Sequence, residues 1–232
     1  MAPVSNIRSC NHRRPEAEYG LPLKKRPMSQ SNAIAPSGRK AILKMLEGLR
    51  SRDPFQREQS REQLFLSGHE VVIPLIRQLK SPSDRMRWEV AKTLGCIGGA
   101  DAAAALAEAL DDENHDVRWV AAEALIRHDE RGLEQTLITL LTKANSIWVR
   151  ESAHHVLSHF ANQKSGRYLR PLLRLFGGFE PAVTIPPAAL ATLRELRQRI
   201  SRELPPQCRL VITGSSTSGV SRRGRCQATA KP

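Results

Sequence analysis

Three stretches of this chain repeat one pattern: MRWEVAKTLG at residues 86–95, VRWVAAEALI at residues 117–126 and VRESAHHVLS at residues 149–158. The arginine at the second position of each stretch recurs after 31 and then 32 residues. A fixed period of this length is typical of helical solenoids, in which each repeat is a helix pair that packs on its neighbours. The pattern therefore predicts an all-α fold.

Short turn signals divide the chain into helix pairs. Asp53-Pro54 joins a capping residue to a proline suited to the first helical position, and Gly177-Gly178 ends the regular pattern. Apolar residues spaced three and four apart between such signals predict amphipathic helices. We expect about four pairs, the fourth joining residues 147–161 to residues 166–176. A capping helix at residues 39–49, with Ser37 as its N-cap, is predicted to precede them.

The composition divides the chain into five segments. Residues 38–178 are predicted to form a right-handed α-solenoid with its capping helix, and residues 188–203 a C-terminal helix that caps the stack or projects from it. The prolines of residues 179–187 predict a linker. Residues 1–37 and 204–232 have too little apolar surface to offset the entropy lost on ordering, so we expect disordered basic tails.

The net charge of +13 lies mainly outside the repeats. Residues 1–37 carry six basic and two acidic side chains, residues 178–232 carry nine and three, and residues 38–177 carry 21 and 18. A field that attracts an anionic partner would therefore come from the two ends. The residues expected to make weak anion contacts are Lys24, Lys25, Arg26, Arg222, Arg223 and Arg225.

Cysteine spacing and hydropathy indicate the compartment. Cys10, Cys96, Cys208 and Cys226 form no C-x-x-C pair, which predicts neither a disulfide framework nor a zinc site. No apolar run follows the basic residues near the start of the sequence, so we expect no secretory signal. No stretch approaches the ~18 apolar residues of a membrane span. We therefore expect a cytoplasmic protein that does not enter a membrane.

The second stretch also carries a family resemblance. DVR at residues 116–118, followed by AA at 121–122 and AL at 124–125, resembles the HEAT-like repeat, and residues 84–98 match it too. The closest form is the short one of phycobilisome-lyase-like proteins and deoxyhypusine hydroxylase. The resemblance covers about residues 53–178. It implies a stack of antiparallel helix pairs, with functions that range from scaffold to lyase subunit to di-iron oxygenase.

The enzymatic branches of that family can be tested on residues. The hydroxylase resemblance implies His-Glu pairs directly after the repeat arginine, where both side chains bind iron. The matching pairs here are Trp88-Glu89, Trp119-Val120 and Glu151-Ser152. The imidazoles are missing, and one carboxylate does not make such a site. Nothing is diagnostic of a bilin site, so we predict no catalytic, cofactor-binding or metal-binding residue.

The histidines of the third stretch are a weaker metal candidate. His155 and His159 stand four residues apart beside His154, a spacing that can hold a metal. They lack the H-E-x-x-H pattern and a third ligand. We interpret them as one face of a helix.

The repeat arginines have two interpretations. Arg87, Arg118 and Arg150 could form a basic ladder for an acidic partner. In solenoids, however, most of the stability lies at the interfaces between repeats. We therefore favour a structural ladder in which each arginine pairs with a carboxylate of the repeat turns, such as Asp84 or Asp116.

The tryptophans are the best candidates for a contact surface. Trp119 stands two residues after Val117, about 200° around the helix and off the apolar stripe, and Trp88 has the same relation to Met86. Aligned aromatic side chains are favoured anchors at protein interfaces. Packing against the next helix pair is the competing interpretation, which is slightly favoured because tryptophan is mostly buried. Trp88, Trp119 and Trp148 are the predicted protein-binding residues.

Three functions are compatible with these features. The leading hypothesis is a non-catalytic scaffold that holds another protein on a preorganised surface. The second is an enzyme or enzyme accessory of the lyase or hydroxylase kind. The third is a protein whose basic tails contact nucleic acid without sequence preference, and whose binding weakens steeply with salt.

Overall fold

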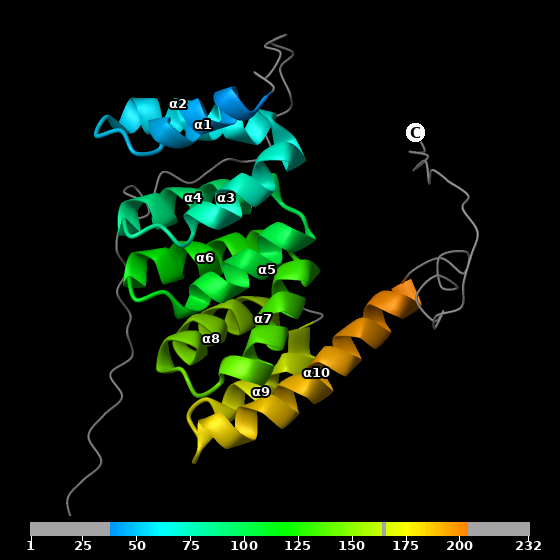
Figure 1. Cartoon of the computed structure of the whole chain (residues 1–232). Coiled ribbons are helices and arrows are strands. Elements are labelled where there is room, and N and C mark those ends of the chain that lie inside the picture. Colours follow the sequence, from blue (N-terminus) through cyan, green and yellow to red (C-terminus); the bar gives the residue numbers. More distant parts are fainter. Residues whose placement is uncertain (1–37, 164–165, 204–232) are drawn as a thin grey trace, which may run out of the picture. The chain divides into compact units, whose positions relative to one another are not determined.

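The computed structural model describes residues 38–163 and 166–203 (Figure 1). Within these ranges the chain forms ten α-helices, three short 3-10 helices and no strand. The α-helices are α1 (Arg39–Gly48), α2 (Pro54–Leu66), α3 (Val72–Gln78), α4 (Asp84–Ile97), α5 (Ala100–Glu108), α6 (His115–Arg127), α7 (Glu130–Lys143), α8 (Ile147–Ala161), α9 (Arg170–Leu175) and α10 (Pro181–Glu203). The 3-10 helices are η1 (Gly68–Val71), η2 (Ala109–Asp111) and η3 (Gly166–Leu169).

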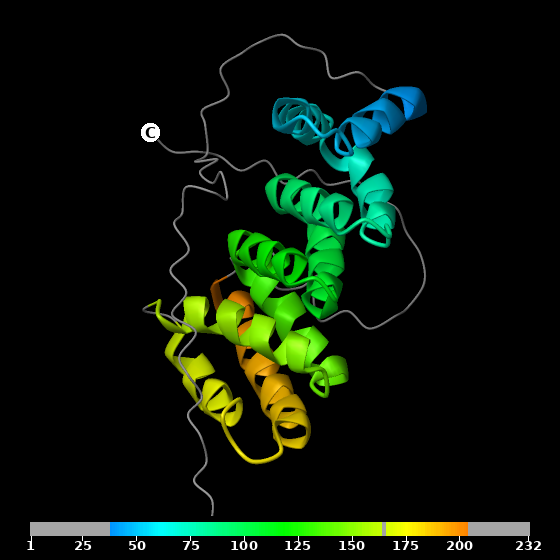
Figure 2. The same cartoon turned by 90° about the vertical axis from the view of Figure 1, so that its left-hand side faces the viewer.

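The helices stack in two layers. The first helices of the pairs lie side by side, since α4 contacts both α2 and α6, and α6 contacts α8. The second helices form the other layer, in which α5 contacts α3 and α7 (Figures 1 and 2). This arrangement confirms the predicted all-α solenoid. None of the described helices is both long enough and apolar enough to cross a membrane.

Each first helix starts at a side-chain cap. The capping residues are Asp53, Ser83, Asn114 and Ser146. Their side-chain oxygens accept hydrogen bonds of 2.8 to 3.4 Å from amides of the first helical turn, which would otherwise lack partners. The predicted cap Ser37 lies outside the described residues, and Gly38 occupies the N-cap position of α1.

Small residues allow the helices to approach closely. A Cβ on Gly95 of α4 would lie 2.6 Å from the Cβ of Ala124 in α6. A Cβ on Gly132 of α7 would lie 1.8 Å from the carbonyl oxygen of Leu125. Glycine is therefore required at both helix contacts. The core around them is one continuous cluster built largely from leucine, alanine and valine.

The region of residues 179–187 differs from its predicted linker. Helix α10 begins at Pro181 and contains Pro186 and Pro187. Its buried apolar side chains are Ile185, Ala189, Leu193 and Leu196. Burial of this stripe outweighs the backbone hydrogen bonds that the two prolines remove. The prolines predicted a linker because they disfavour a helix locally, whereas the helix forms because tertiary contacts bury its apolar side chains.

Helix α10 also takes the place in the second layer that was predicted for residues 166–176. Those residues form η3 and the six-residue helix α9, which contacts α8 and α10. Helix α10 packs along α7 instead (Figure 1). Helix α9 has only six residues, of which Leu172 is buried. The C-terminal helix therefore completes the stack.

Candidate protein-interaction surface

The repeat arginines close the turns that precede their helices. Nη1 of Arg118 donates to the backbone carbonyls six and five positions earlier, at 2.8 and 3.1 Å. Arg150 makes the same two hydrogen bonds at 2.6 and 3.0 Å, and Arg57 of α2 makes them at 3.0 and 3.1 Å. Arg87 makes the first of them at 2.9 Å. The recurrent arginine thus has a common role within each repeat.

Arg87 also joins two repeats. Its Nε and Nη2 donate to the two carboxylate oxygens of Asp112 at 2.7 and 2.9 Å, and Nη2 lies 3.2 Å from Oε1 of Glu113. The side chains of Arg87 and Asp112 are only 8% and 10% exposed. The hydrogen bond to Asp112 raises the pKa of the Arg87 guanidinium. A paired fork of this kind fixes both distance and orientation between repeats.

The acidic residues named from the sequence have other partners. Oδ2 of Asp84 accepts a hydrogen bond of 3.0 Å from Nδ2 of Asn114. Oδ1 of Asp116 lies 3.5 Å from Nδ1 of His115. The predicted pairing of the repeat arginines with Asp84 and Asp116 is therefore wrong. The carboxylate that pairs with Arg87 is that of Asp112, which lies in the turn before α6.

Glu89 occupies the position where a hydroxylase would carry an iron-binding carboxylate. It is 1% exposed and accepts hydrogen bonds from Nε of Arg57, at 2.6 Å, and from Nη1 of Arg61. Each carboxylate oxygen therefore faces a guanidinium of α2, so Glu89 ties α4 to α2. Within residues 38–163 and 166–203, no three His, Cys, Asp or Glu side chains gather as a metal site would require.

The three tryptophans differ in exposure. Trp88 is half-buried against the core, with Nζ of Lys92 5.0 Å from the centre of its ring. Trp119 is 38% exposed and Trp148 is 41% exposed. Ile147, next to Trp148, is 56% exposed. We refer to Trp119, Trp148 and Ile147 as the tryptophan edge.

Neighbouring side chains hold both exposed rings in place. The Trp119 ring lies 4.5 Å from the His155 ring, and Nε2 of His155 lies 2.8 Å from Oε1 of Glu123. This hydrogen bond lowers the pKa of the Glu123 carboxyl. The guanidinium carbon of Arg118 lies 5.2 Å from the centre of the Trp148 ring, within cation–π range. Contacts between α6 and α8 therefore orient the edge.

The chain matches the family model of HEAT repeats over residues 36–126 and 108–175. It belongs to the HEAT-repeat family. The two matched ranges overlap and together reach from α1 to α9, so α10 lies outside the HEAT repeats. No curated protein matches the chain.

The histidines of the last HEAT repeat have separate neighbours. His155 contacts Trp119 and Glu123, whereas the ring of His154 lies 5.3 Å from that of Phe176. Burial lowers the pKa of His154, and the neighbouring His155 lowers it further. His155 and His154 thus pack against aromatic side chains of different segments, Trp119 and Phe176.

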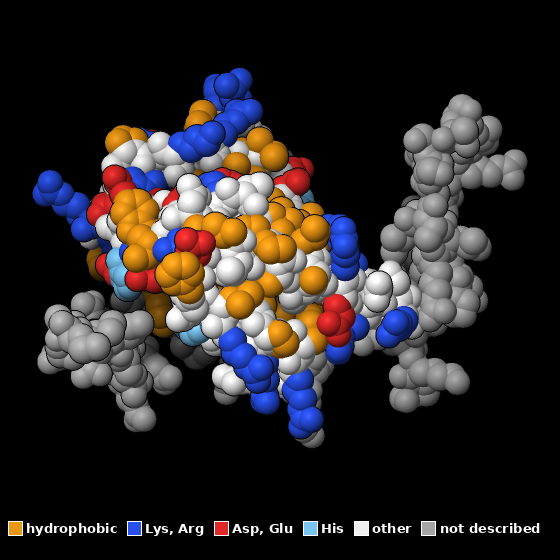
Figure 3. Space-filling model, turned by 90° about the horizontal axis from the view of Figure 1, so that it is seen from below, with side chains coloured by type: hydrophobic (Ala, Val, Ile, Leu, Met, Phe, Trp, Pro, Cys, Tyr) orange, Lys and Arg blue, Asp and Glu red, His pale blue; other side chains and the backbone are white. Residues whose placement is uncertain are grey.

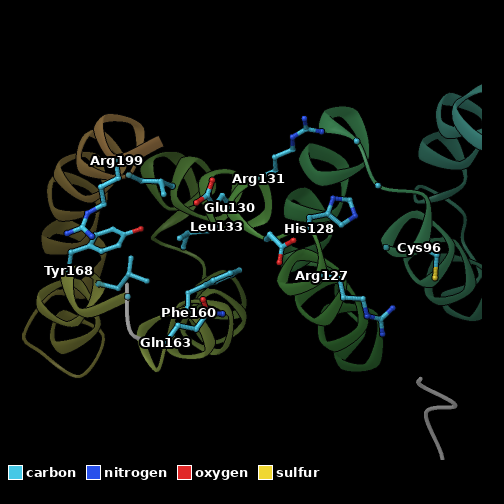
Figure 4. A pocket seen from close by; sticks show the side chains of 17 residues that line it. Cys96, Arg127, His128, Glu130, Arg131, Leu133, Phe160, Gln163, Tyr168 and Arg199 are labelled. Carbon is cyan, nitrogen blue, oxygen red and sulfur yellow. The ribbon is translucent and has the colours of Figure 1, made fainter. Parts of the chain in front are cut away.

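A cavity of about 810 Å³ opens where the turns of three HEAT repeats meet α10 (Figure 4). Its walls combine apolar residues (Leu133, Phe160, Leu169, Leu196) with charged ones (Arg127, Asp129, Glu130, Arg131, Arg199). Both signs of charge are present, so the cavity has no clear ligand preference. The sequence did not predict it, because its walls come from segments that lie far apart in the chain.

His128 is the unusual residue of this cavity. Its Nε2 lies 3.3 Å from the carbonyl oxygen of Leu94, and its buried Nδ1 has no hydrogen-bond partner among the described residues. Burial lowers the pKa of His128, and the nearby Arg131 and Arg127 lower it further. The neutral imidazole is thus favoured in the folded chain.

The basic clusters predicted to contact anions cannot be placed in this arrangement. They lie outside the described residues and comprise Lys24, Lys25, Arg26, Arg222, Arg223 and Arg225.

Proposed function

We propose that this HEAT-repeat chain is a scaffold that binds another protein through the tryptophan edge. The observation that carries the proposal is the exposure of Trp119 and Trp148, at 38% and 41%, on two neighbouring first helices. Tryptophan is enriched among the residues that dominate binding energy at protein interfaces. Large rings exposed in adjacent repeats therefore offer two anchors on one surface.

The edge is also preorganised. The contacts of Trp119 with His155 and of Trp148 with Arg118 restrict both rings before a partner arrives. Binding then loses less side-chain entropy than it would with freely rotating rings. Stacked repeats supply the rigid support on which such a surface is held.

The contacts of Glu89 favour a scaffold over an iron enzyme of the hydroxylase kind. Arg57 and Arg61 already engage its two carboxylate oxygens. A metal ion there would have to displace two guanidinium groups and would face their positive charge. The role of an iron enzyme of the hydroxylase kind therefore has no support from this position.

Capture from native-host lysate tests the proposal. The full chain and a fragment of residues 38–203 serve as baits at low and high salt, with and without nuclease. A Trp119→Ala/Trp148→Ala variant is compared with Phe55→Ala/Phe65→Ala, which removes exposed aromatic rings from α2. We expect a defined protein to remain on both baits at high salt and to be lost only with the tryptophan variant.

One result would contradict the scaffold, and another would contradict its contact at the tryptophan edge. If capture requires residues outside 38–203 and disappears with nuclease or high salt, the basic ends act on nucleic acid. If the same protein is retained equally by both aromatic variants, the contact lies elsewhere on the chain.

A further inference from the structure

Helix α10 exposes an apolar stripe opposite its buried face. Val183, Pro187 and Leu190 recur at i, i+4 and i+7, and Val183 lies about 200° around the helix from the buried Ile185. Val183 is 66% exposed and Leu190 is 38% exposed. Seen from this end of the molecule, hydrophobic side chains gather over the middle of the face, with lysine and arginine and a smaller number of Asp and Glu side chains at its margins (Figure 3).

The position of α10 suggests what kind of element covers this stripe. In the second layer α5 lies between α3 and α7, and α7 lies between α5 and α10. Helix α10 is the last member of that layer among the described helices, and its stripe faces outward. The spacing of Val183, Pro187 and Leu190 is that of a helix packed against another helix. A further helix would therefore continue the stack.

The charge around the stripe is positive. Residues 166–202 contain seven arginines and only two acidic residues, Glu180 and Glu195. Arg170 and Arg174 on α9 are exposed, and so is Arg194, one helical turn beyond Leu190. Arg197 and Arg199 of α10 are ion-paired with Glu134 and Glu195. The exposed guanidinium groups of Arg174 and Arg194 remain to favour carboxylates at the flanks of an element that covers the stripe.

The same charge argues against a covering element from this chain. Residues 204–232 contain five basic residues and no acidic one, and residues 1–37 contain six basic and two acidic. Residues 39–66, which form α1 and α2, contain seven basic and four acidic. Neither the chain ends nor the opposite end of a second copy offers the complementary charge.

We propose that the outer face of α10 is a second docking site, and that it binds an amphipathic helix of another protein with aliphatic residues on one side and Asp or Glu at its flanks. Val183, Pro187 and Leu190 form the apolar contact, and Arg174 and Arg194 supply the charge. This site lies on a different helix from the tryptophan edge, so it goes beyond the proposed scaffold function and can be tested separately.

Two synthetic peptides test this site on the full chain. The first is a labelled helix of about 18 residues with leucines at i, i+4 and i+7 and glutamates at their flanks. The second has lysine in place of every glutamate. Fluorescence anisotropy at physiological salt measures binding. We expect the acidic peptide to bind at least about tenfold more tightly than the basic peptide.

Chain variants locate the contact. Val183→Ser/Leu190→Ser should weaken the acidic peptide at least about tenfold, and Arg174→Gln/Arg194→Gln should weaken it and reduce its salt dependence. Leu43→Ser/Ile73→Ser removes exposed aliphatic side chains from α1 and α3 and should have no effect. Trp119→Ala/Trp148→Ala should also leave binding unchanged, which separates this site from the tryptophan edge. Helical circular dichroism confirms that each variant is folded.

Three results would overturn the proposal. The first is failure of the acidic peptide to bind. Equal binding of this peptide to the chain and to its Val183→Ser/Leu190→Ser variant counts in the same way, because it would mean that charge alone attracts the peptide. The second is self-association of the chain that this variant abolishes, which would make a second copy the occupant. The third is binding to phosphatidylserine vesicles that the variant abolishes while peptide binding persists, which would indicate a lipid surface.

Discussion

The α2–α4 junction and the α6–α8 junction place their polar contacts at different depths. At the first, the side chain of Glu89 is 2% exposed, and Arg57 and Arg61 are 18% and 16% exposed. At the second, His155 and Glu123 pair with 36% and 31% of their side chains exposed. The same repeat geometry therefore builds a buried tie at one junction and, beside Trp119, a partly exposed polar pair at the other.

The largest expected effect is at the buried tie. Glu89→Ala leaves Arg57 and Arg61 without their shared carboxylate, so we expect a loss of about 3 kcal/mol in the free energy of unfolding. Glu58→Ala is the matched control, because its carboxylate lies 3.9 Å from the same Arg61 but is 75% exposed. That change should lower stability by less than about 0.5 kcal/mol. Urea unfolding measures the free energy of unfolding of both variants. Equal losses would contradict the claim that the buried ion pair stabilises the fold more than the exposed one.

A smaller loss is expected at the α4–α6 junction. Arg87→Lys keeps the charge but cannot form the paired hydrogen bonds to Asp112, so stability should fall by about 2 kcal/mol. Arg150→Lys loses only hydrogen bonds to backbone carbonyls, so the free energy of unfolding should fall by less than about 1 kcal/mol. Thermal unfolding of the two variants distinguishes a clamp between repeats from a turn contact. A larger loss for Arg150→Lys would contradict this ranking.

The smallest effect concerns pH at the α6–α8 junction. The pKa of Glu123 is lowered in the folded chain by its hydrogen bond with His155. This pair therefore adds stability above the unfolded carboxyl pKa of about 4.3, and that stability is lost as pH falls through the lower folded value. His155→Ala should lower stability by about 0.5 kcal/mol near neutral pH and have no effect in acid. A loss independent of pH would show that packing of the His155 ring on Trp119, and not its hydrogen bond to Glu123, stabilises this junction.

The repeats could be predicted from sequence because their signals are local and recurrent. The arginine period, the cap at Asp53 and the spacing of the apolar residues agree with one another, so they point to one architecture. Packing against the next helix pair, the slightly favoured interpretation for both Trp88 and Trp119, agrees with the half-burial of Trp88. The 38% exposure of Trp119 agrees instead with its place off the apolar stripe.

Features that depend on packing between distant segments were missed. The choice of Asp112 over Asp84 as the partner of Arg87 depends on where the next turn lies in space. Helix α10 crosses two prolines because Ile185 and Leu193 are buried, which no local rule reveals. The cavity beside His128 forms only where α10 meets the repeat turns.

Site-specific photo-crosslinking in the native host tests the tryptophan edge most directly. Photoreactive p-benzoylphenylalanine is placed at Trp119, at Trp148, or at Phe55, an exposed aromatic of α2 that serves as the control. We expect one discrete crosslinked protein from both tryptophan positions and none from Phe55. Crosslinks to the same protein from Phe55 alone, or from no position on the edge, would contradict it.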